Sequence, residues 1–134
     1  MKRFIMMVCT LAMFGILAAC SVQTLSTDKV KDLEFTVVTE DIPEELCEMI
    51  ASQKGEVFKL TYADQGKLYI AEGYGEQATS GYSIEVEECF ESSNAIYFHT
   101  NLLGPSKEER IVKEPTYPYI VVQMDFIEKH VVFM

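Results

Sequence analysis

From Glu56 onward, apolar and polar residues alternate along the chain, and this period of two constrains the fold more than any other feature. Side chains of a β-strand point alternately to its two faces, so the pattern predicts strands that bury one face. Turn residues at 64–66 and 91–94 are expected to close two hairpins. The expected strands are 35–38, 57–62, 68–71, 82–86, 95–100, 119–124 and 130–134.

One helix is expected before these strands, over residues 43–54. A proline followed by two glutamates suits the first helical turn and the positive end of the helix dipole. Leu46, Cys47 and Ile50 recur at helical spacing, so the apolar side of this helix should lie on the sheet. The predicted fold class is therefore α+β: an antiparallel β-sheet or small sandwich of two hairpins plus later strands, with one N-terminal helix packed on it.

The N-terminus has the pattern of a secretory signal. Two basic residues at 2–3 precede an uncharged apolar run over 4–19, which is a little short for a membrane span. The run ends in Leu17-Ala18-Ala19-Cys20, which resembles the bacterial lipobox. That resemblance implies cleavage before Cys20 and lipidation of its thiol; an ordinary signal peptide or a membrane anchor is the alternative.

The chain is therefore divided into a lipoprotein signal peptide over 1–19, a lipidated tether over 20–33 and one domain over 34–134. The expected location is the outside of a bacterial cell membrane, held there by acyl chains, palmitate among them. Acyl chains, and not charge, would provide the attachment, because the net charge is −10. The same acidity argues against nucleic acid as a partner, since phosphate binding needs clustered Lys and Arg.

Catalytic and metal-binding patterns are weak. Residues 73–78 match the glycine pattern of a dinucleotide site, but they lead into a strand and not into a helix. His99 and His130 lie in strand-like apolar settings, and the Glu85 and Glu87 pair is expected in so acidic a chain. We therefore expect no enzyme, no cofactor and no metal.

Two cysteines remain beyond the lipobox. Cys47 and Cys89 could form one disulfide outside the cell, or they could be two small buried hydrophobes. The sequence leaves both possibilities open.

The glycine-rich stretch from Gly73 to Gly81 is the candidate binding loop. Glycine permits tight turns and close backbone approach, and loops on a rigid sheet are where binding residues tend to lie. The alternative is a plain connection whose glycines only satisfy turn geometry.

Residues 75–84 resemble the hallmark of the PrcB C-terminal domain family: a glycine, a spacer, threonine, a small residue, Gly-Tyr-Ser and an alternating strand. Residues 103–105 and 117–122 look like the second half of that family, so the resemblance spans roughly 57–124. The chain departs from the pattern at Ala78, where proline is common.

The resemblance implies an accessory role, because the family's named member is a lipoprotein subunit of a cell-surface protease complex. No catalytic residue carries over. A secreted or surface protease is thus the expected partner, and if Tyr82 packs inward, Tyr74 becomes the better contact. The candidate partner-binding residues are Gly73, Tyr74, Gly75, Thr79, Ser80, Gly81, Tyr82, Leu103, Gly104 and Pro105.

A second resemblance gives an alternative function. Residues 78–82 are similar to a loop of chagasin-type inhibitors of cysteine peptidases, which are immunoglobulin-like sandwiches. The chain lacks the Asn-Pro pair of that loop and has no Trp. Direct protease inhibition is therefore the alternative, and an unrelated envelope role is the third.

Overall fold

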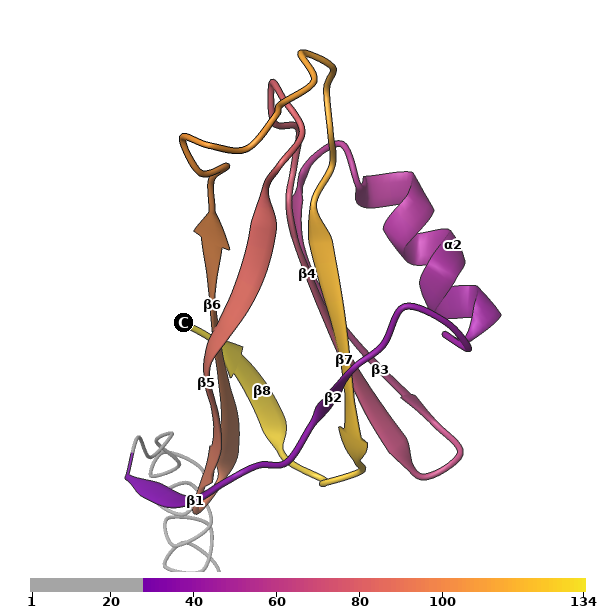
Figure 1. Cartoon of the computed structure of the whole chain (residues 1–134). Helices are drawn as coiled ribbons and strands as arrows, with labels where there is room; N and C mark the ends of the chain where they lie inside the picture. The colour runs from indigo at the N-terminus through magenta and orange to yellow at the C-terminus, as the bar shows by residue number, and fades with distance from the viewer. Residues whose placement is uncertain (1–27) are drawn as a thin grey trace, which may run out of the picture.

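The computed structural model describes residues 28–134, so the predicted signal peptide over 1–19 and the predicted lipidation site Cys20 lie outside the described residues (Figure 1). None of the described helices has the length and apolarity needed to cross a membrane. The elements are β1 (Lys29–Asp32), β2 (Thr36–Val37), α2 (Glu44–Gln53), β3 (Val57–Asp64), β4 (Lys67–Tyr74), β5 (Ser83–Ser92), β6 (Ala95–Leu103), β7 (Tyr119–Asp125) and β8 (His130–Phe133).

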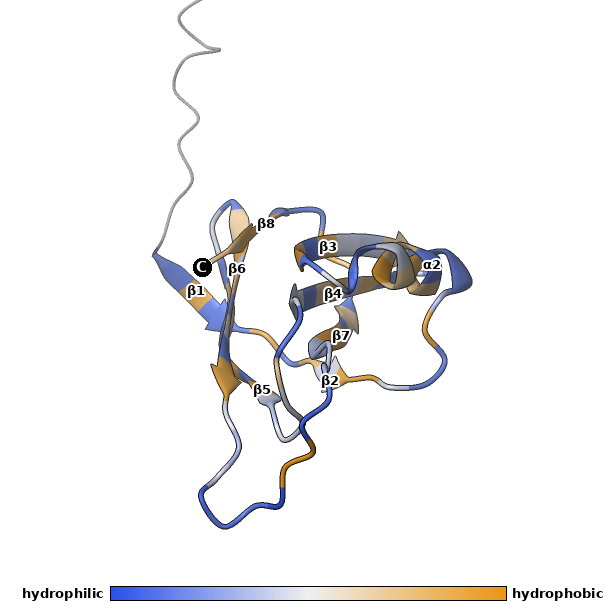
Figure 2. Ribbon diagram, turned by 90° about the horizontal axis from the view of Figure 1, so that it is seen from above, coloured by the Kyte–Doolittle hydropathy of each residue, from blue (hydrophilic) through white to orange (hydrophobic). Residues whose placement is uncertain are grey.

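The strands form two four-stranded sheets that face each other, as Figure 2 shows from above. Sheet A has the order β1-β5-β6-β8, and sheet B has the order β2-β7-β4-β3. The predicted α+β class is confirmed, including the hairpins β3–β4 and β5–β6, and of the two arrangements left open by the sequence the structure has the sandwich. One pair differs from the antiparallel prediction: β8 runs parallel to β6, because β7 belongs to sheet B and the chain crosses to sheet A at 126–129.

The main core lies between the sheets. Alternate residues of β4 and β7 meet alternate residues of β5 and β6, as the period of two requires. Cys89 belongs to this core as a small apolar residue. The buried members are Leu68, Ile70, Cys89, Ile96, Phe98, Ile120, Val122 and Met124.

A second cluster joins α2 to the outer face of sheet B, so the molecule has three layers (Figure 2). The helix predicted over 43–54 is confirmed at Glu44–Gln53, and it buries Leu46 and Ile50. These side chains pack on Phe58 and its neighbours in sheet B. Cys47, which the spacing placed on the same face, is exposed.

The disulfide alternative is wrong. Cys47 lies on the exposed side of α2, beyond sheet B, whereas Cys89 lies between the two sheets. Both thiols are free. A whole sheet separates them, so the second possibility, a small buried hydrophobe, describes Cys89 but not Cys47.

The folded part of the chain begins earlier than expected. The segment 20–33 was predicted to be a tether, but Lys29–Asp32 forms β1 and pairs with the end of β5. The sequence Lys-Val-Lys-Asp has one apolar residue and therefore gives no alternation to detect.

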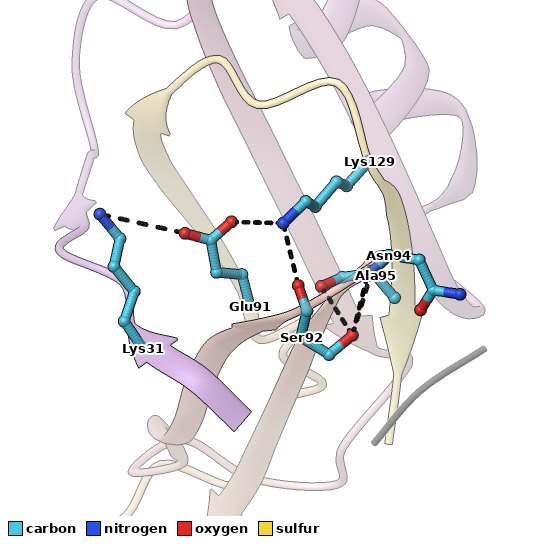
Figure 3. Close-up of polar contacts among 6 residues, drawn as sticks. All are labelled: Lys31, Glu91, Ser92, Asn94, Ala95 and Lys129. Atoms are coloured by element: carbon cyan, nitrogen blue, oxygen red, sulfur yellow. Dashed lines mark hydrogen bonds and ion pairs between the residues drawn. The ribbon is translucent and has the colours of Figure 1, made fainter. Parts of the chain in front are cut away.

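A polar cluster fixes β1 and the crossing at 126–129 against the end of β5 (Figure 3). The Lys129 ammonium group donates to Glu91 Oε2 at 2.8 Å and to the Ser92 carbonyl at 2.9 Å. Lys31 on β1 approaches the other Glu91 oxygen at 3.9 Å. Because Glu91 and Lys129 are largely shielded from water, this contact helps to hold β8 in its parallel position.

Candidate protein-binding site

The glycine-rich loop 75–82 and the long loop 104–118 meet at one end of the sandwich, at the top of Figure 1. Gln77 and Thr116 form an isolated bridge, with N–H···O distances of 2.8 and 2.9 Å in the two directions. The Thr116 hydroxyl donates to the Thr79 carbonyl at 2.7 Å. The two loops are therefore one hydrogen-bonded structure, although their bridged residues are distant in sequence.

Ser80 makes the second connection between the loops. Its backbone N–H donates to the Val112 carbonyl at 3.0 Å, and its hydroxyl oxygen accepts from the Val112 N–H at 2.8 Å. The Thr79 hydroxyl donates to the adjacent Ser80 carbonyl at 3.1 Å. The polar groups of Thr79 and Ser80, two candidate contacts, thus hold loop 104–118 in place.

Gly81 and Tyr82 pack against Gly104 and Pro105 at the start of the long loop. Gly81 has a φ of +92°, and a Cβ there would lie 2.7 Å from Pro105 Cβ and 3.5 Å from Ile111 Cγ2. Tyr82 is half-buried, and its ring lies 3.8 Å from where a Cβ of Gly104 would be. The structure therefore brings the candidate residues at 103–105 against the glycine-rich loop.

The Tyr74 hydroxyl points between the two sheets. The Thr100 hydroxyl donates to Glu72 Oε2 at 2.7 Å, and the Tyr74 hydroxyl lies 2.6 Å from Thr100 Oγ1. Since Thr100 has one hydrogen and gives it to Glu72, Tyr74 is the donor in the second contact. These two hydrogen bonds anchor Tyr74, the last residue of β4, before the loop begins.

Gly73 allows a close contact on the other face of β4. The Phe58 ring lies only 2.1 Å from where a Cβ of Gly73 would be, so the ring occupies the space of the missing side chain. Gly73 and Gly75 are both buried. Of the glycines proposed as contacts, these two serve the packing of the sheet.

The exposed surface of this end comes mainly from residues of loop 104–118 that were not among the predicted contacts, together with Leu103, which was. The apolar side chains of Leu103, Ile111 and Val112 are exposed beside Lys107 to Arg110. Tyr117 is also exposed and donates to Glu76 at 3.2 Å, which raises the pKa of Tyr117. Two adjacent β-branched residues inside a charged loop were the signal that could have identified Ile111 and Val112.

The histidines and paired glutamates lie away from this end or on the outer face of sheet A. His99 Nδ1 lies 3.1 Å from Glu87 Oε2, next to the irregularity between Val86 and Glu88 that adds one residue to β5. His130 is exposed at the start of β8. Over residues 28–134, no three His, Cys, Asp or Glu side chains gather as metal ligands would.

A family comparison agrees with the resemblance predicted from the sequence. The PrcB C-terminal family model matches residues 68–125, which confirms the recognition of that family. The matched segment begins in β4 and ends with β7, so it contains both loops but neither α2 nor β8. No curated protein and no solved structure matches the chain significantly.

Proposed function

We propose that this chain, with its PrcB C-terminal segment, is a non-enzymatic, lipid-anchored binding module on the outside of a bacterial cell membrane. Its role is that of an accessory or regulatory subunit of an extracellular protease complex. The family match supports the link to a protease, and the joined loops support a binding role.

One observation carries the proposal: two loops are hydrogen-bonded into a single surface that exposes Leu103, Ile111 and Val112. A surface that is already ordered loses little conformational entropy when a partner binds. Exposed apolar side chains surrounded by charge are typical of protein interaction sites. We call these three residues, with the loops 75–82 and 104–118, the loop end.

The position of the tether suits this role. The described chain enters at β1, where Lys29 pairs with Ser92 at the far end of β5 from the loops (Figure 1). β5 has 10 residues, and such a strand is about 33 Å long. A lipid on Cys20 would therefore hold β1 near the membrane and direct the loop end outward.

The binding proposal is tested by affinity capture from native membranes with the tagged full chain. Val112 and Val37 are matched in exposure, at 53% and 52%, but Val37 lies on β2. We expect a secreted protease to be recovered with the unmodified chain and with Val37→Asp. Recovery should fall about tenfold or more with Val112→Asp, because a charge would enter the interface.

Equal recovery with both variants would contradict the loop end as the binding surface, and capture of no protease would contradict the accessory role. The chagasin-like alternative is separated by adding the purified chain to the captured protease. A fall in peptidase rate would identify an inhibitor, whereas an accessory subunit leaves the rate unchanged or raises it.

The anchor is tested separately with Cys20→Ser. We expect the unmodified chain to incorporate a palmitate analogue and to sediment with membranes, because acyl burial contributes about 0.8 kcal/mol per methylene. Cys20→Ser should lose the label. A label that persists in Cys20→Ser would disprove lipidation at this residue.

A further inference from the structure

β3 is the longest and most regular edge strand of the described sandwich, and Lys59 is its only charged residue on the side that faces sheet A. β1 and β8 have four residues each, β2 has two, and β1 also has a register irregularity. Short or irregular edges are a common protection against strand addition. β3 has eight residues, pairs with β4 at eight consecutive positions without a bulge, and contains no proline.

The β3–β4 turn determines which backbone groups of β3 point outward. Gln65 and Gly66 both have positive φ, so the two-residue turn is of type I′ and makes Asp64–Lys67 a hydrogen-bonded pair. Hydrogen-bonded and non-hydrogen-bonded pairs alternate in an antiparallel ladder. The residues that direct N–H and C=O groups away from β4 are therefore Val57, Lys59, Thr61 and Ala63.

These outward groups have no partner within the part of the chain that the structure describes. The side chains of the same four residues are exposed, although they share a face with Leu68 and Ile70 of the core. Sheet A therefore covers this face of β4 but not of β3. Below them lies a groove of about 390 Å³. Its apolar lining includes Ala63, Leu68, Phe126, Ile127 and Val131, and Glu128, Lys129 and His130 line it as well.

Lys59 is the only charged side chain among the four, and it makes no ion pair with the described residues. Its ammonium group lies 5.9 Å from the centre of the Phe133 ring. Glu72 is its cross-strand neighbour, but the Glu72 carboxylate accepts from Thr100. A carboxylate on an added strand, facing Lys59, would complement this charge.

We propose that β3 accepts an extended segment of a partner protein as an added antiparallel strand. The segment directs small apolar side chains into the groove at alternate positions and places an acidic residue opposite Lys59. Main-chain hydrogen bonds supply much of the affinity in this mode, and the alternate side chains supply specificity. This inference is independent of the loop end, because none of the β3 and groove residues it uses belongs to the loops 75–82 and 104–118.

Hydrogen exchange of the full chain in detergent micelles tests the proposal. The probe is a synthetic peptide of about eight residues that alternates valine and threonine and has one glutamate opposite Lys59. We expect about 1 mM peptide to slow amide exchange at Lys59 and Thr61 at least fivefold. No slowing at these amides overturns the proposal.

Thr61→Pro and Thr61→Val form a matched pair. Proline at Thr61 removes an outward N–H and no ladder bond, so β3 should still fold, whereas valine keeps the N–H. Protection of the Lys59 amide should disappear with Thr61→Pro and remain with Thr61→Val. Equal protection in both variants would overturn strand addition.

A charge exchange provides the test that does not depend on a proline. Lys59→Glu should weaken binding of the glutamate peptide and strengthen binding of a peptide with lysine at that position, by about fivefold in the ratio of affinities. An unchanged ratio would overturn the proposed partner chemistry. Protection that instead rises with protein concentration and no peptide would identify a second copy as the occupant and overturn the partner segment.

Discussion

The Thr100 hydroxyl joins two polar side chains inside the sandwich, and Thr100→Val removes it with almost no change of shape. Thr100 and Glu72 are 5% and 6% exposed, so water cannot easily replace the lost group. In the intact protein Thr100 donates to Glu72 at 2.7 Å and accepts from Tyr74 at 2.6 Å. The variant therefore leaves a buried carboxyl group without its donor and a tyrosine without its acceptor.

The expected loss follows from these two contacts. A hydrogen bond to a carboxylate contributes about 1.5–3 kcal/mol, and one between neutral groups about 0.5–1.5 kcal/mol. The added methyl group of valine returns about 0.8 kcal/mol through burial. We expect Thr100→Val to lower the free energy of unfolding by about 2–3 kcal/mol, and Tyr74→Phe by about 1 kcal/mol.

Urea unfolding of the variants and of their double variant measures these values. Tyr74→Phe should cost almost nothing in the Thr100→Val background, because its acceptor is already absent. Glu72→Gln serves as a control, since the amide oxygen can still accept from Thr100. A Thr100→Val loss below about 0.5 kcal/mol, or fully additive losses with Tyr74→Phe, would refute the two linked hydrogen bonds from Tyr74 to Thr100 and from Thr100 to Glu72.

Other predictions concern single positions. Gly81→Ala should lower the free energy of unfolding by about 2 kcal/mol, because a side chain at φ +92° is strained and would meet Pro105. Gly55→Ala is the control, since a Cβ there meets open space and should not destabilise the protein. Chemical unfolding measures both variants. Glu91→Gln should cost about 1–3 kcal/mol in the same assay, because it removes the carboxylate that holds the crossing connection. A thiol reagent should modify Cys47 in the folded protein and Cys89 only after unfolding. Burial raises the pKa of the Cys89 thiol from 9.0 to about 11, so stability should fall between those pH values as the unfolded thiol ionises. This fall should be smaller in Cys89→Ala, where only other groups such as Tyr117 contribute to it.

The parts of the fold that could be predicted from the sequence are those whose signals are local. The helix and both hairpins come from residue spacing and turn residues that lie close together in the chain. β1 and the parallel position of β8 could not be predicted this way. Both depend on pairing with distant residues, and the contact of Lys129 with Glu91 that holds the crossing spans 38 positions.

The position of the candidate site could be predicted from the sequence, but the contacts that build it could not. The glycine-rich loop and residues 103–105 do lie together, as expected. The sequence did not reveal that Ser80 would bond to Val112, because that contact joins residues 32 positions apart. Without that contact, nothing in the sequence places Ile111 and Val112 beside the glycine-rich loop, and neither was predicted as a contact.

The positions that carry the family resemblance have an explanation in these contacts. Within 75–84, the Thr79 carbonyl accepts from Thr116, Gly81 leaves space for Pro105, and the ring of Tyr82 lies against Gly104. Each of these contacts joins the first loop to the second and leaves little of the motif free to meet a partner. If the motif builds the loop end in this way, changes to it should act on the order of loop 104–118 first and on binding as a consequence. Thr79 and Gly81 would then define the shape of the binding surface, while Ile111 and Val112, outside the motif, would determine which protein it fits.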